Sequence, residues 1–261
     1  MIGFLMQART VGTTVALLYA TALPAQAAPC QLKMALEQWP PYVFSKPNSA
    51  PTGLDLELTQ AILREAGCAL QLMPELPTAR RQRQFEQGGL DLLLAASDTA
   101  ERRKIARFSI PYRTESVSLF VRSEQLPRYQ QLRGLDGLLA MQVSLLAPKV
   151  GWYGAAYAKL QPQLLASGHL STFLNFQQGL RMLEAGRADL ILGDTAALRY
   201  EARELGLAIS ALPLMVLRAP VHLMLNKSTT TMEELELINA AITRLEKQGV
   251  LAEIRSRYGE F

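Results

Sequence analysis

The chain has 261 residues, of which 49% are hydrophobic and 19% charged, and its formal net charge is +4 at pH 7. This balance is typical of a globular protein, and the positive charge is too small to indicate a nucleic-acid partner. The only histidines are His169 and His222, and they form no cluster with cysteine, so we expect no metal, no cofactor and no Ser-His-Asp triad.

Residues 1–27 have the pattern of a secretory signal peptide. Arg9 is their lone charge, an apolar stretch runs from Val11 to Leu23, and small residues precede a cleavage point after Ala27. A retained membrane anchor is the alternative, but the apolar stretch is short and Pro24 interrupts it. We therefore expect a periplasmic protein whose mature part of about 230 residues forms one large domain or two smaller ones.

Cys30 and Cys68 are the only cysteines, and both follow the signal peptide. An even pair in an oxidising compartment favours a disulfide bond, with two buried free thiols as the alternative. Each cysteine begins or precedes a predicted strand, at Leu32–Leu36 and Ala69–Met73. Adjacent parallel strands would bring the two sulfur atoms together.

The mature part alternates strands and helices, which predicts an α/β fold with a mostly parallel sheet. Gly53 and Gly67 bound the first helix, whose apolar residues recur at helical spacing. The further elements expected in this first half are helices at Leu54–Ala66 and Ala79–Gln87, strands at Leu90–Ala96 and Val117–Arg122, and a linker at Ser123–Arg128.

Three cations follow the strand at 90–96. A helix predicted to begin near Ala100 would carry Arg102, Arg103 and Lys104 in its first turn, where the helix dipole disfavours positive charge and free N–H groups attract anions. The cluster can therefore form an anion site. Equally, Asp98 or Thr99 can cap the helix while the cations face solvent.

A second region, at about 135–213, repeats part of the first. The segment Gly186–Ala196 follows the plan of Gly89–Ala100: each comes after a helix that ends in glycine, contains an apolar strand, and leads into another helix. The repetition suggests two similar lobes, and ligands bind beyond the carboxyl ends of such strands. Asp194 stands at that point, either as the cap of the helix Thr195–Leu205 or as a cation site. A strand at Val221–Leu225 and helices within 231–258 complete the chain.

The residues T-A-E-R at 99–102, followed by F-S-I-P-Y at 108–112, resemble the signature of bacterial extracellular solute-binding proteins of the polar amino acid type, family 3. The resemblance covers essentially the whole mature chain. It implies a two-lobed periplasmic binding protein (Venus flytrap) fold, in which each lobe is a mostly parallel sheet flanked by helices and two strands cross between the lobes. Lobe 1 would comprise 28–119 plus 222–261, and lobe 2 would comprise 120–221.

The resemblance also implies a binding site. In this family the arginine of the motif holds the α-carboxylate of the ligand, and the second aspartate of a G-x-x-D-x-x-x-x-D pattern holds its ammonium group, while the first is structural. An aromatic residue after the first strand contacts the ligand side chain. The residues at these positions are Arg102 with Ser97 and Thr99 beside it, Asp194 with Asp189 as the structural aspartate, and Trp39 and Tyr42.

The function that the resemblance implies is capture of an amino acid or related small polar solute by lobe closure, by a monomer that serves an ABC permease or a membrane sensor. The usual Gly-Thr turn of the second lobe is missing from the loop 144–154, which leaves the identity of the ligand open. The alternative is a periplasmic cyclohexadienyl dehydratase acting on prephenate or arogenate, with Glu37 as its acid. A stand-alone sensory domain is a third interpretation.

Overall fold

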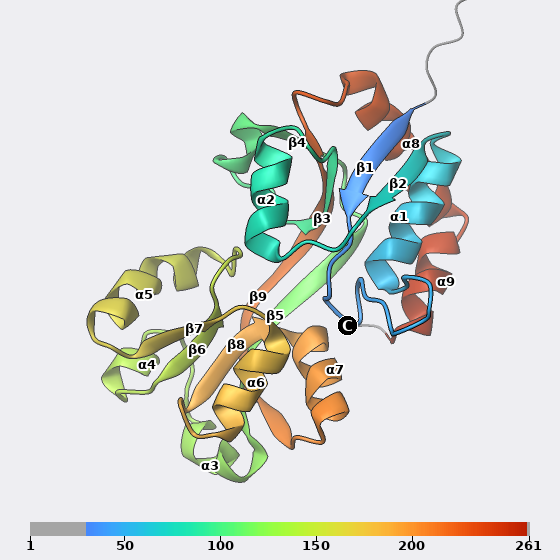
Figure 1. Cartoon of the computed structure of the whole chain (residues 1–261). Helices are drawn as coiled ribbons and strands as arrows, with labels where there is room; N and C mark the ends of the chain where they lie inside the picture. Colours follow the sequence, from blue (N-terminus) through green and yellow to red (C-terminus); the bar gives the residue numbers. More distant parts are fainter. Residues whose placement is uncertain (1–29, 260–261) are drawn as a thin grey trace, which may run out of the picture.

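The computed structural model describes residues 30–259, and the predicted signal peptide at 1–27 lies outside them. Two bodies lie one above the other in Figure 1, and two long strands, β5 (Arg113–Arg122) and β9 (Ile209–Asn226), run through both. No helix of the described part is long and apolar enough to cross a membrane.

The upper body of Figure 1 holds the first elements of the chain and the last two helices. Its elements are β1 (Gln31–Ala35), α1 (Leu54–Glu65), β2 (Ala69–Met73), α2 (Thr78–Glu86), β3 (Leu92–Ala96), the 3₁₀ turn η1 (Arg102–Lys104), β4 (Ala106–Phe108), α8 (Met232–Lys247) and α9 (Val250–Arg257).

The lower body is built from the middle of the chain. Its elements are the 3₁₀ turn η2 (Ser123–Gln125), α3 (Leu126–Tyr129), α4 (Gly137–Ala140), β6 (Leu145–Pro148), α5 (Ala155–Ala166), β7 (Leu170–Phe173), α6 (Phe176–Glu184), β8 (Leu190–Asp194) and α7 (Thr195–Leu205).

The sheets are mixed. β1 pairs with β2 in parallel, and β6 lies parallel to both β7 and β8. The larger sheet has the order β3-β9-β5-β8-β6-β7, with β4 also on β9, and β5 and β9 are antiparallel to their neighbours. The α/β fold is therefore confirmed, while the two crossing strands add antiparallel pairings to the parallel core of each body.

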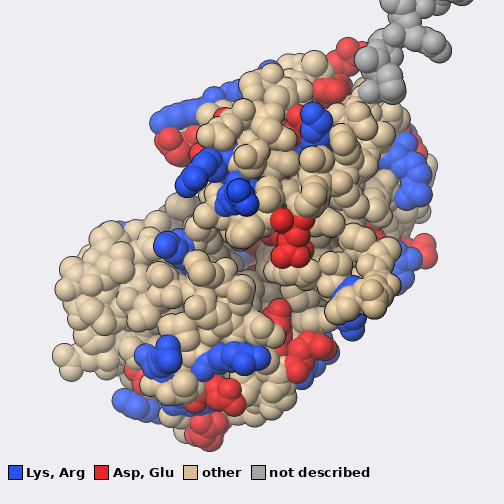
Figure 2. All heavy atoms as spheres, in the orientation of Figure 1, with Lys and Arg blue, Asp and Glu red and all other residues tan. Residues whose placement is uncertain are grey.

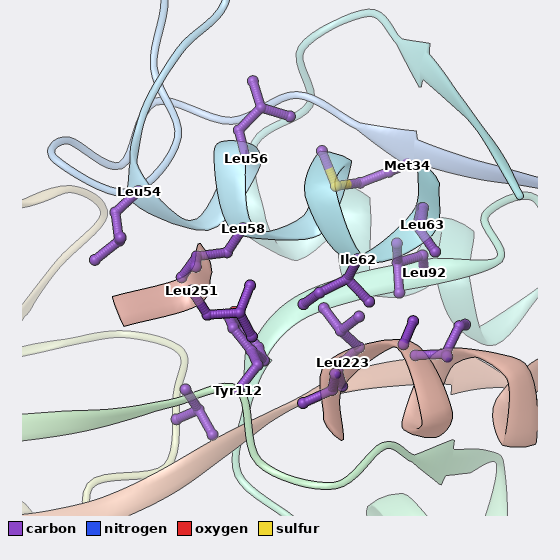
Figure 3. Close-up of a cluster of buried hydrophobic side chains, with 14 of the residues drawn as sticks. Met34, Leu54, Leu56, Leu58, Ile62, Leu63, Leu92, Tyr112, Leu223 and Leu251 are labelled. Atoms are coloured by element: carbon purple, nitrogen blue, oxygen red, sulfur yellow. The ribbon is translucent and has the colours of Figure 1, made fainter. Parts of the chain in front are cut away.

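The helix α1 anchors the core of the upper body. Leu54, Leu58 and Ile62 recur at helical spacing on α1, and all are buried. Figure 3 shows Leu58 and Ile62 on the side of α1 that faces Leu223 of β9. Each fully buried side chain of this kind contributes about 1.5–3 kcal/mol, so the pattern that predicted the helix also accounts for its attachment to the sheet.

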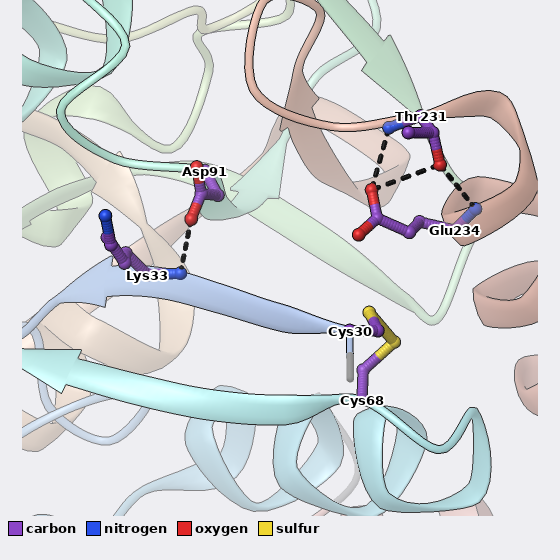
Figure 4. The surroundings of a disulfide bond; sticks show 6 residues. All are labelled: Cys30, Lys33, Cys68, Asp91, Thr231 and Glu234. Atoms are coloured by element: carbon purple, nitrogen blue, oxygen red, sulfur yellow. Dashed lines mark hydrogen bonds between the residues drawn. A yellow bond between two sulfur atoms is a disulfide. The ribbon is translucent and has the colours of Figure 1, made fainter. Parts of the chain in front are cut away.

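Cys30 and Cys68 form a disulfide bond, as predicted. Figure 4 shows it at the start of β1 and β2, where the carbonyl of Cys30 accepts a hydrogen bond from the Ala69 N–H at 2.8 Å. Parallel pairing of the two strands brings the sulfur atoms together. The bond fastens the first strand of the described chain to the α1–β2 unit.

The predicted repeat is visible in the backbone contacts of two aspartates. The Asp91 carboxylate accepts the Lys33 N–H at 2.8 Å, while the Asp91 N–H donates to the Lys33 carbonyl at 2.9 Å (Figure 4). In the same way, the Asp189 carboxylate accepts the Ser144 N–H at 2.9 Å, and the Asp189 N–H donates to the Ser144 carbonyl at 3.1 Å. The Asp189 carboxylate also accepts a hydrogen bond from the Tyr129 hydroxyl. Asp91 thus joins the start of β3 to β1, and Asp189 joins the start of β8 to that of β6. Both aspartates therefore have a structural role.

The prediction of a helix that begins near Ala100 is wrong. Ala100 and Glu101 form a turn, η1 is only three residues long, and β4 begins at Ala106. The segment has to return to the level of the start of β3, because β4 pairs with the same end of β9 and in the same direction as β3. The Thr99 hydroxyl accepts the Arg102 N–H at 3.3 Å within that turn. The cations therefore do not lie in the first turn of a helix.

The strand predicted at Val221–Leu225 is part of the much longer β9, which begins at Ile209. Pro213 and Pro220 lie where β9 pairs only with β5, and proline is tolerated on a strand that leaves one edge unpaired.

Candidate functional site

The candidate site lies where the carboxyl ends of β3 and β8 approach the crossing strands. Figure 2 shows the surface hollowed between the two bodies, with charged atoms of both signs around the hollow. Four groups here are close enough to shift the pKa values of one another. They are Arg102 after β3, Glu115 on β5, Tyr153 after β6 and Asp194 at the end of β8.

Arg102 is the one cation of its cluster that turns toward this site. Its Nη1 donates to the Ser97 carbonyl at 3.0 Å, and no carboxylate within the described chain lies within 4 Å of it. Burial lowers the pKa of Arg102, while Glu115 and Tyr153 raise it. An arginine has five N–H donors, so most of this guanidinium remains available for an anion.

The two neighbouring cations differ from Arg102 because protein carboxylates already hold them. Arg103 donates from Nε and Nη2 to the two oxygens of Asp98, both at 2.6 Å, and Lys104 pairs with Glu101 at 2.5 Å. The side chains of both cations are 68% exposed, where such pairs contribute little to stability.

Ser97 and Thr99 form the corner around Arg102. Ser97 is buried and offers its carbonyl to Arg102, and the Thr99 hydroxyl accepts the Arg102 N–H. Ala95, just before them, has φ = 48°, and its N–H donates to the Tyr112 hydroxyl at 2.9 Å. A left-handed alanine within a strand is uncommon, and it redirects the end of β3 into this corner.

The two oxygens of Asp194 have different surroundings. Oδ1 accepts the Ala197 N–H at 2.9 Å, which caps α7, and also accepts the Tyr42 hydroxyl at 2.9 Å. Oδ2 is fully buried and has no hydrogen-bond partner among the described residues. Burial raises the pKa of Asp194, although Arg113 opposes the rise. The cap and a cation site are therefore compatible, because each uses a different oxygen.

Tyr42 belongs to the wall behind Asp194. It is only 1% exposed, its ring lies 4.4 Å from that of Trp39, and the guanidinium of Arg113 stacks 4.1 Å above it. Arg113 in turn donates to both oxygens of Asp55, at 2.5 and 2.7 Å. Tyr42 thus orients Asp194 from a packed position, while Trp39 is only half-buried and lies nearer the surface.

The start of α1 fixes the position of this aromatic loop. The first N–H groups of α1 have no partner within the helix, and the carbonyls of Pro41 and Tyr42 accept those of Leu54 and Asp55 at 3.0 and 2.9 Å. Gly53 allows this approach: its φ is 125°, and a Cβ atom there would lie 2.3 Å from the Tyr42 carbonyl oxygen.

Glu115 is a site residue that the sequence reasoning missed. It is 8% exposed, and no described residue gives it a hydrogen bond or an ion pair. Burial raises its pKa to about 7, opposed by Arg113 and Arg102 and reinforced by Asp194 and Asp55. The signal in the sequence was the alternation of Arg113, Glu115 and Val117, which places two charges on the buried face of one strand.

The atypical loop of the second region reaches the site through Tyr153. Its hydroxyl donates to the Val150 carbonyl at 3.0 Å, and burial together with Glu115 raises its pKa above the ordinary range. Trp152 next to it is 37% exposed. The loop therefore supplies a tyrosine where the sequence lacks the Gly-Thr turn.

Glu37, the acid of the dehydratase alternative, is held by Arg81 at 2.5 Å. Burial raises its pKa, and Arg81 lowers it. Within residues 30–259, no group of three or more His, Cys, Asp or Glu side chains could hold a metal ion.

Two bodies joined by two crossing strands, with Arg102, Glu115 and Asp194 between them, form the architecture of a two-lobed binding protein. The model of the bacterial extracellular solute-binding proteins, family 3, matches residues 32–261, and the chain belongs to this family. No curated protein sequence matches the chain.

Solved structures with the same fold come from several kinds of protein. An amino acid ABC transporter substrate-binding protein from Streptococcus pneumoniae, bound to L-arginine, is 20% identical with a TM-score of 0.70, covering 87% of this chain and 93% of its own. A histidine kinase sensor domain is 18% identical with a TM-score of 0.72, covering 89% and 96%. An ancestral amino acid-binding protein, a precursor of cyclohexadienyl dehydratase, is 20% identical with a TM-score of 0.68, covering 87% and 94%.

Proposed function

We propose that this protein captures an amino acid or a related small polar solute between its two bodies, with Arg102 on the carboxylate and Asp194 on the ammonium group. The observation that carries the proposal is the buried Oδ2 of Asp194, which has no hydrogen-bond partner in the part of the chain that the structure describes. A buried acceptor without a partner costs about 1–3 kcal/mol, and more if it is charged, so a ligand cation at this point is strongly favoured.

The same proposal divides the chain into lobe 1, at 28–119 plus 222–261, and lobe 2, at 120–221. Arg102 would then belong to lobe 1 and Asp194 to lobe 2, so one solute would connect the lobes. Ser97 and Thr99 would flank the solute carboxylate, Trp39 would contact the solute side chain, and Tyr42 would hold Asp194 in place.

Two charged contacts do not suffice for tight binding. Hydrogen bonds to charged groups contribute about 1.5–3 kcal/mol each, and micromolar affinity needs about 8 kcal/mol after ordering costs. Lobe closure and burial of the solute side chain must provide the rest, which is consistent with a hinge formed by the two crossing strands.

We further propose export to the periplasm by the segment 1–27 and a monomeric protein that serves an ABC permease or a membrane sensor. The disulfide between Cys30 and Cys68 is consistent with an oxidising compartment. The structural relatives include a transporter protein and a sensor domain, so both kinds of partner remain part of the proposal.

We propose that the protein binds its solute without catalysing a reaction on it. Glu37 is engaged by Arg81, which leaves it poorly placed to act as the acid of a dehydratase. Incubation of the mature protein with prephenate and with arogenate tests this directly. Absence of phenylpyruvate and of phenylalanine is the expected result, and turnover of either compound would decide for the enzyme.

A thermal-shift screen of the mature protein against amino acids and carboxylates tests the binding function. A solute at 100 times its dissociation constant stabilises the protein by about 2.7 kcal/mol, which gives a clear shift. Arg102→Ala and Asp194→Asn should both lose the shift. Asparagine is a good N-cap, so the second variant leaves α7 intact.

Arg103→Ala is the matched control, since it removes a neighbouring cation that Asp98 already holds. It should keep the full shift. The site is wrong if Arg102→Ala and Asp194→Asn behave like this control.

A further inference from the structure

The charges around the site do not balance. Arg113 is paired with Asp55, Glu37 with Arg81, and Asp98 with Arg103, so these side chains contribute no net charge. Among the described residues, the charged groups around the site that form no ion pair are Arg102, Glu115 and Asp194. One cation therefore faces two carboxylates.

The sheet places the two carboxylates on one face. Val117 lies directly opposite Asp194 in the antiparallel pair of β5 and β8, and directly opposite residues share a face. Glu115 is two residues from Val117 on β5, so strand alternation turns it to the same face. Such diagonal neighbours lie about 7–8 Å apart, a distance that a small molecule can bridge.

Neither carboxylate forms an ion pair within residues 30–259. Glu115 is 8% exposed and Asp194 is 3% exposed, yet Glu115 has no hydrogen bond or ion pair among the described residues and Asp194 has none on Oδ2. A solute that binds Arg102 with its carboxylate and Asp194 with its α-ammonium group uses one of them. Glu115 is then left without a charged partner, and a carboxylate that is only 8% exposed is poorly compensated by solvent.

Resting on the proposed function, we propose that Glu115 determines specificity: it receives a second positive group of the solute, so that the site selects an amino acid with a cationic side chain, either an ammonium or a guanidinium. Such a solute has a net charge of +1 and neutralises the group of Arg102, Glu115 and Asp194. A neutral side chain leaves Glu115 unpaired. An acidic side chain adds repulsion at short range.

Calorimetric titration at pH 8 tests the proposal with L-arginine, L-lysine, L-glutamine and L-glutamate as the solutes. We expect the wild-type protein to bind arginine or lysine about 10-fold or more tightly than glutamine, because a charge-assisted contact contributes more than one factor of ten, and to bind glutamate most weakly. In Glu115→Gln the affinity for the cationic solute should fall about 10-fold or more, while the affinity for glutamine should stay the same or rise.

Glu236→Gln is the control, because it removes the same charge from an exposed position on α8 and should leave all affinities unchanged. The inference is overturned if the wild-type protein prefers glutamine or glutamate, or if Glu115→Gln weakens all solutes equally. A wild-type protein that binds none of the four overturns the inference alone. The proposed function fails only if the thermal-shift screen against amino acids and carboxylates also finds no solute, which separates the two failures.

Discussion

Arg113 and Glu115 lie two residues apart on β5, and the fold treats their charges differently. Arg113 is matched by both oxygens of Asp55 and by the face of Tyr42. Glu115 is almost as buried, but no residue within 30–259 forms a hydrogen bond or an ion pair with it. The first charge belongs to the scaffold, and the second is available to a ligand.

Glu115 makes the stability of the protein depend on pH. Its pKa is raised from 4.5 to about 7, so the folded state holds the proton more tightly than the unfolded state. The free energy of unfolding should therefore fall as pH rises from about 4.5 to about 7, by at most about 3 kcal/mol at 1.36 kcal/mol per pKa unit. Burial is the main cause, and Arg113, Asp194, Asp55 and Arg102 adjust it.

Glu115→Gln removes this dependence. Urea unfolding should find the variant more stable than the wild-type protein at pH 8 and equally stable near pH 4.5. Asp194 also has a raised pKa and interacts with Glu115, so the difference between the two proteins reports Glu115 together with its coupling to Asp194. A constant difference at both pH values would show that Glu115 does not titrate as described.

The pair of Arg113 and Asp55 should be sensitive to the loss of one partner. Asp55→Asn leaves a buried guanidinium without its counter-charge, and the expected loss is about 3–5 kcal/mol of unfolding free energy. The double variant Asp55→Asn/Arg113→Met should lose less than the two single variants together, because it removes both charges. Additive losses in urea unfolding would refute the coupling.

At the scale of elements, the loop of Trp39 and Tyr42 depends on the start of α1. The loop carbonyls cap the helix, and the approach is so close that Gly53 has no room for a side chain. The position of Tyr42, and through its hydroxyl that of Asp194, is thus set by the junction between a loop and a helix.

Gly53→Ala should separate this loop from the helix. A Cβ atom would lie 2.3 Å from the Tyr42 carbonyl oxygen, and φ = 125° is a conformation that alanine avoids. We expect a loss of about 3 kcal/mol or more in unfolding free energy and weaker solute binding. Gly67→Ala is the control, since Gly67 also has a positive φ of 73° but open space around its Cβ position.

Gly67→Ala should lose only about 1 kcal/mol, from the left-handed backbone, and keep its affinity. Equal losses in the two variants would mean that the contact with Tyr42 is unimportant.

Periodic segments were predictable from sequence, and irregular ones were not. Leu54–Glu65 and Thr195–Leu205 form the expected helices because apolar spacing and a flanking glycine or aspartate agree there. The helix expected near Ala100 failed because pairing of β4 with β9 outweighs a local capping pattern. The pairing of Tyr42 with Asp194 joins residues far apart in sequence, and local periodicity contains no information about such a contact.

At the scale of the whole molecule, the two bodies meet at the start of α7 as well as through β5 and β9. Ala196 and Ala197 pack into the core of the upper body, the Tyr42 hydroxyl bonds to Asp194, and the rings of Phe44 and Tyr200 lie 5.7 Å apart. These contacts are few, so a solute that bridges the bodies can add substantially to them.

Small-angle X-ray scattering should detect this bridging. A saturating solute should reduce the radius of gyration of the wild-type protein and leave that of Arg102→Ala unchanged at the same concentration. A solute that binds the wild-type protein without any change in scattering would argue against lobe closure.

Calorimetry with modified solutes shows whether Arg102 and Asp194 hold the two ends of one solute. L-argininamide lacks the carboxylate charge of L-arginine, and Nα-acetyl-L-arginine lacks the α-ammonium group. The wild-type protein should bind both about 10–100-fold more weakly than L-arginine, since each loses a charge-assisted contact. Arg102→Ala should no longer distinguish the amide from L-arginine, and Asp194→Asn should no longer distinguish the acetyl derivative. Equal affinities of the wild-type protein for all three compounds, or variants that keep its preferences, would contradict the account.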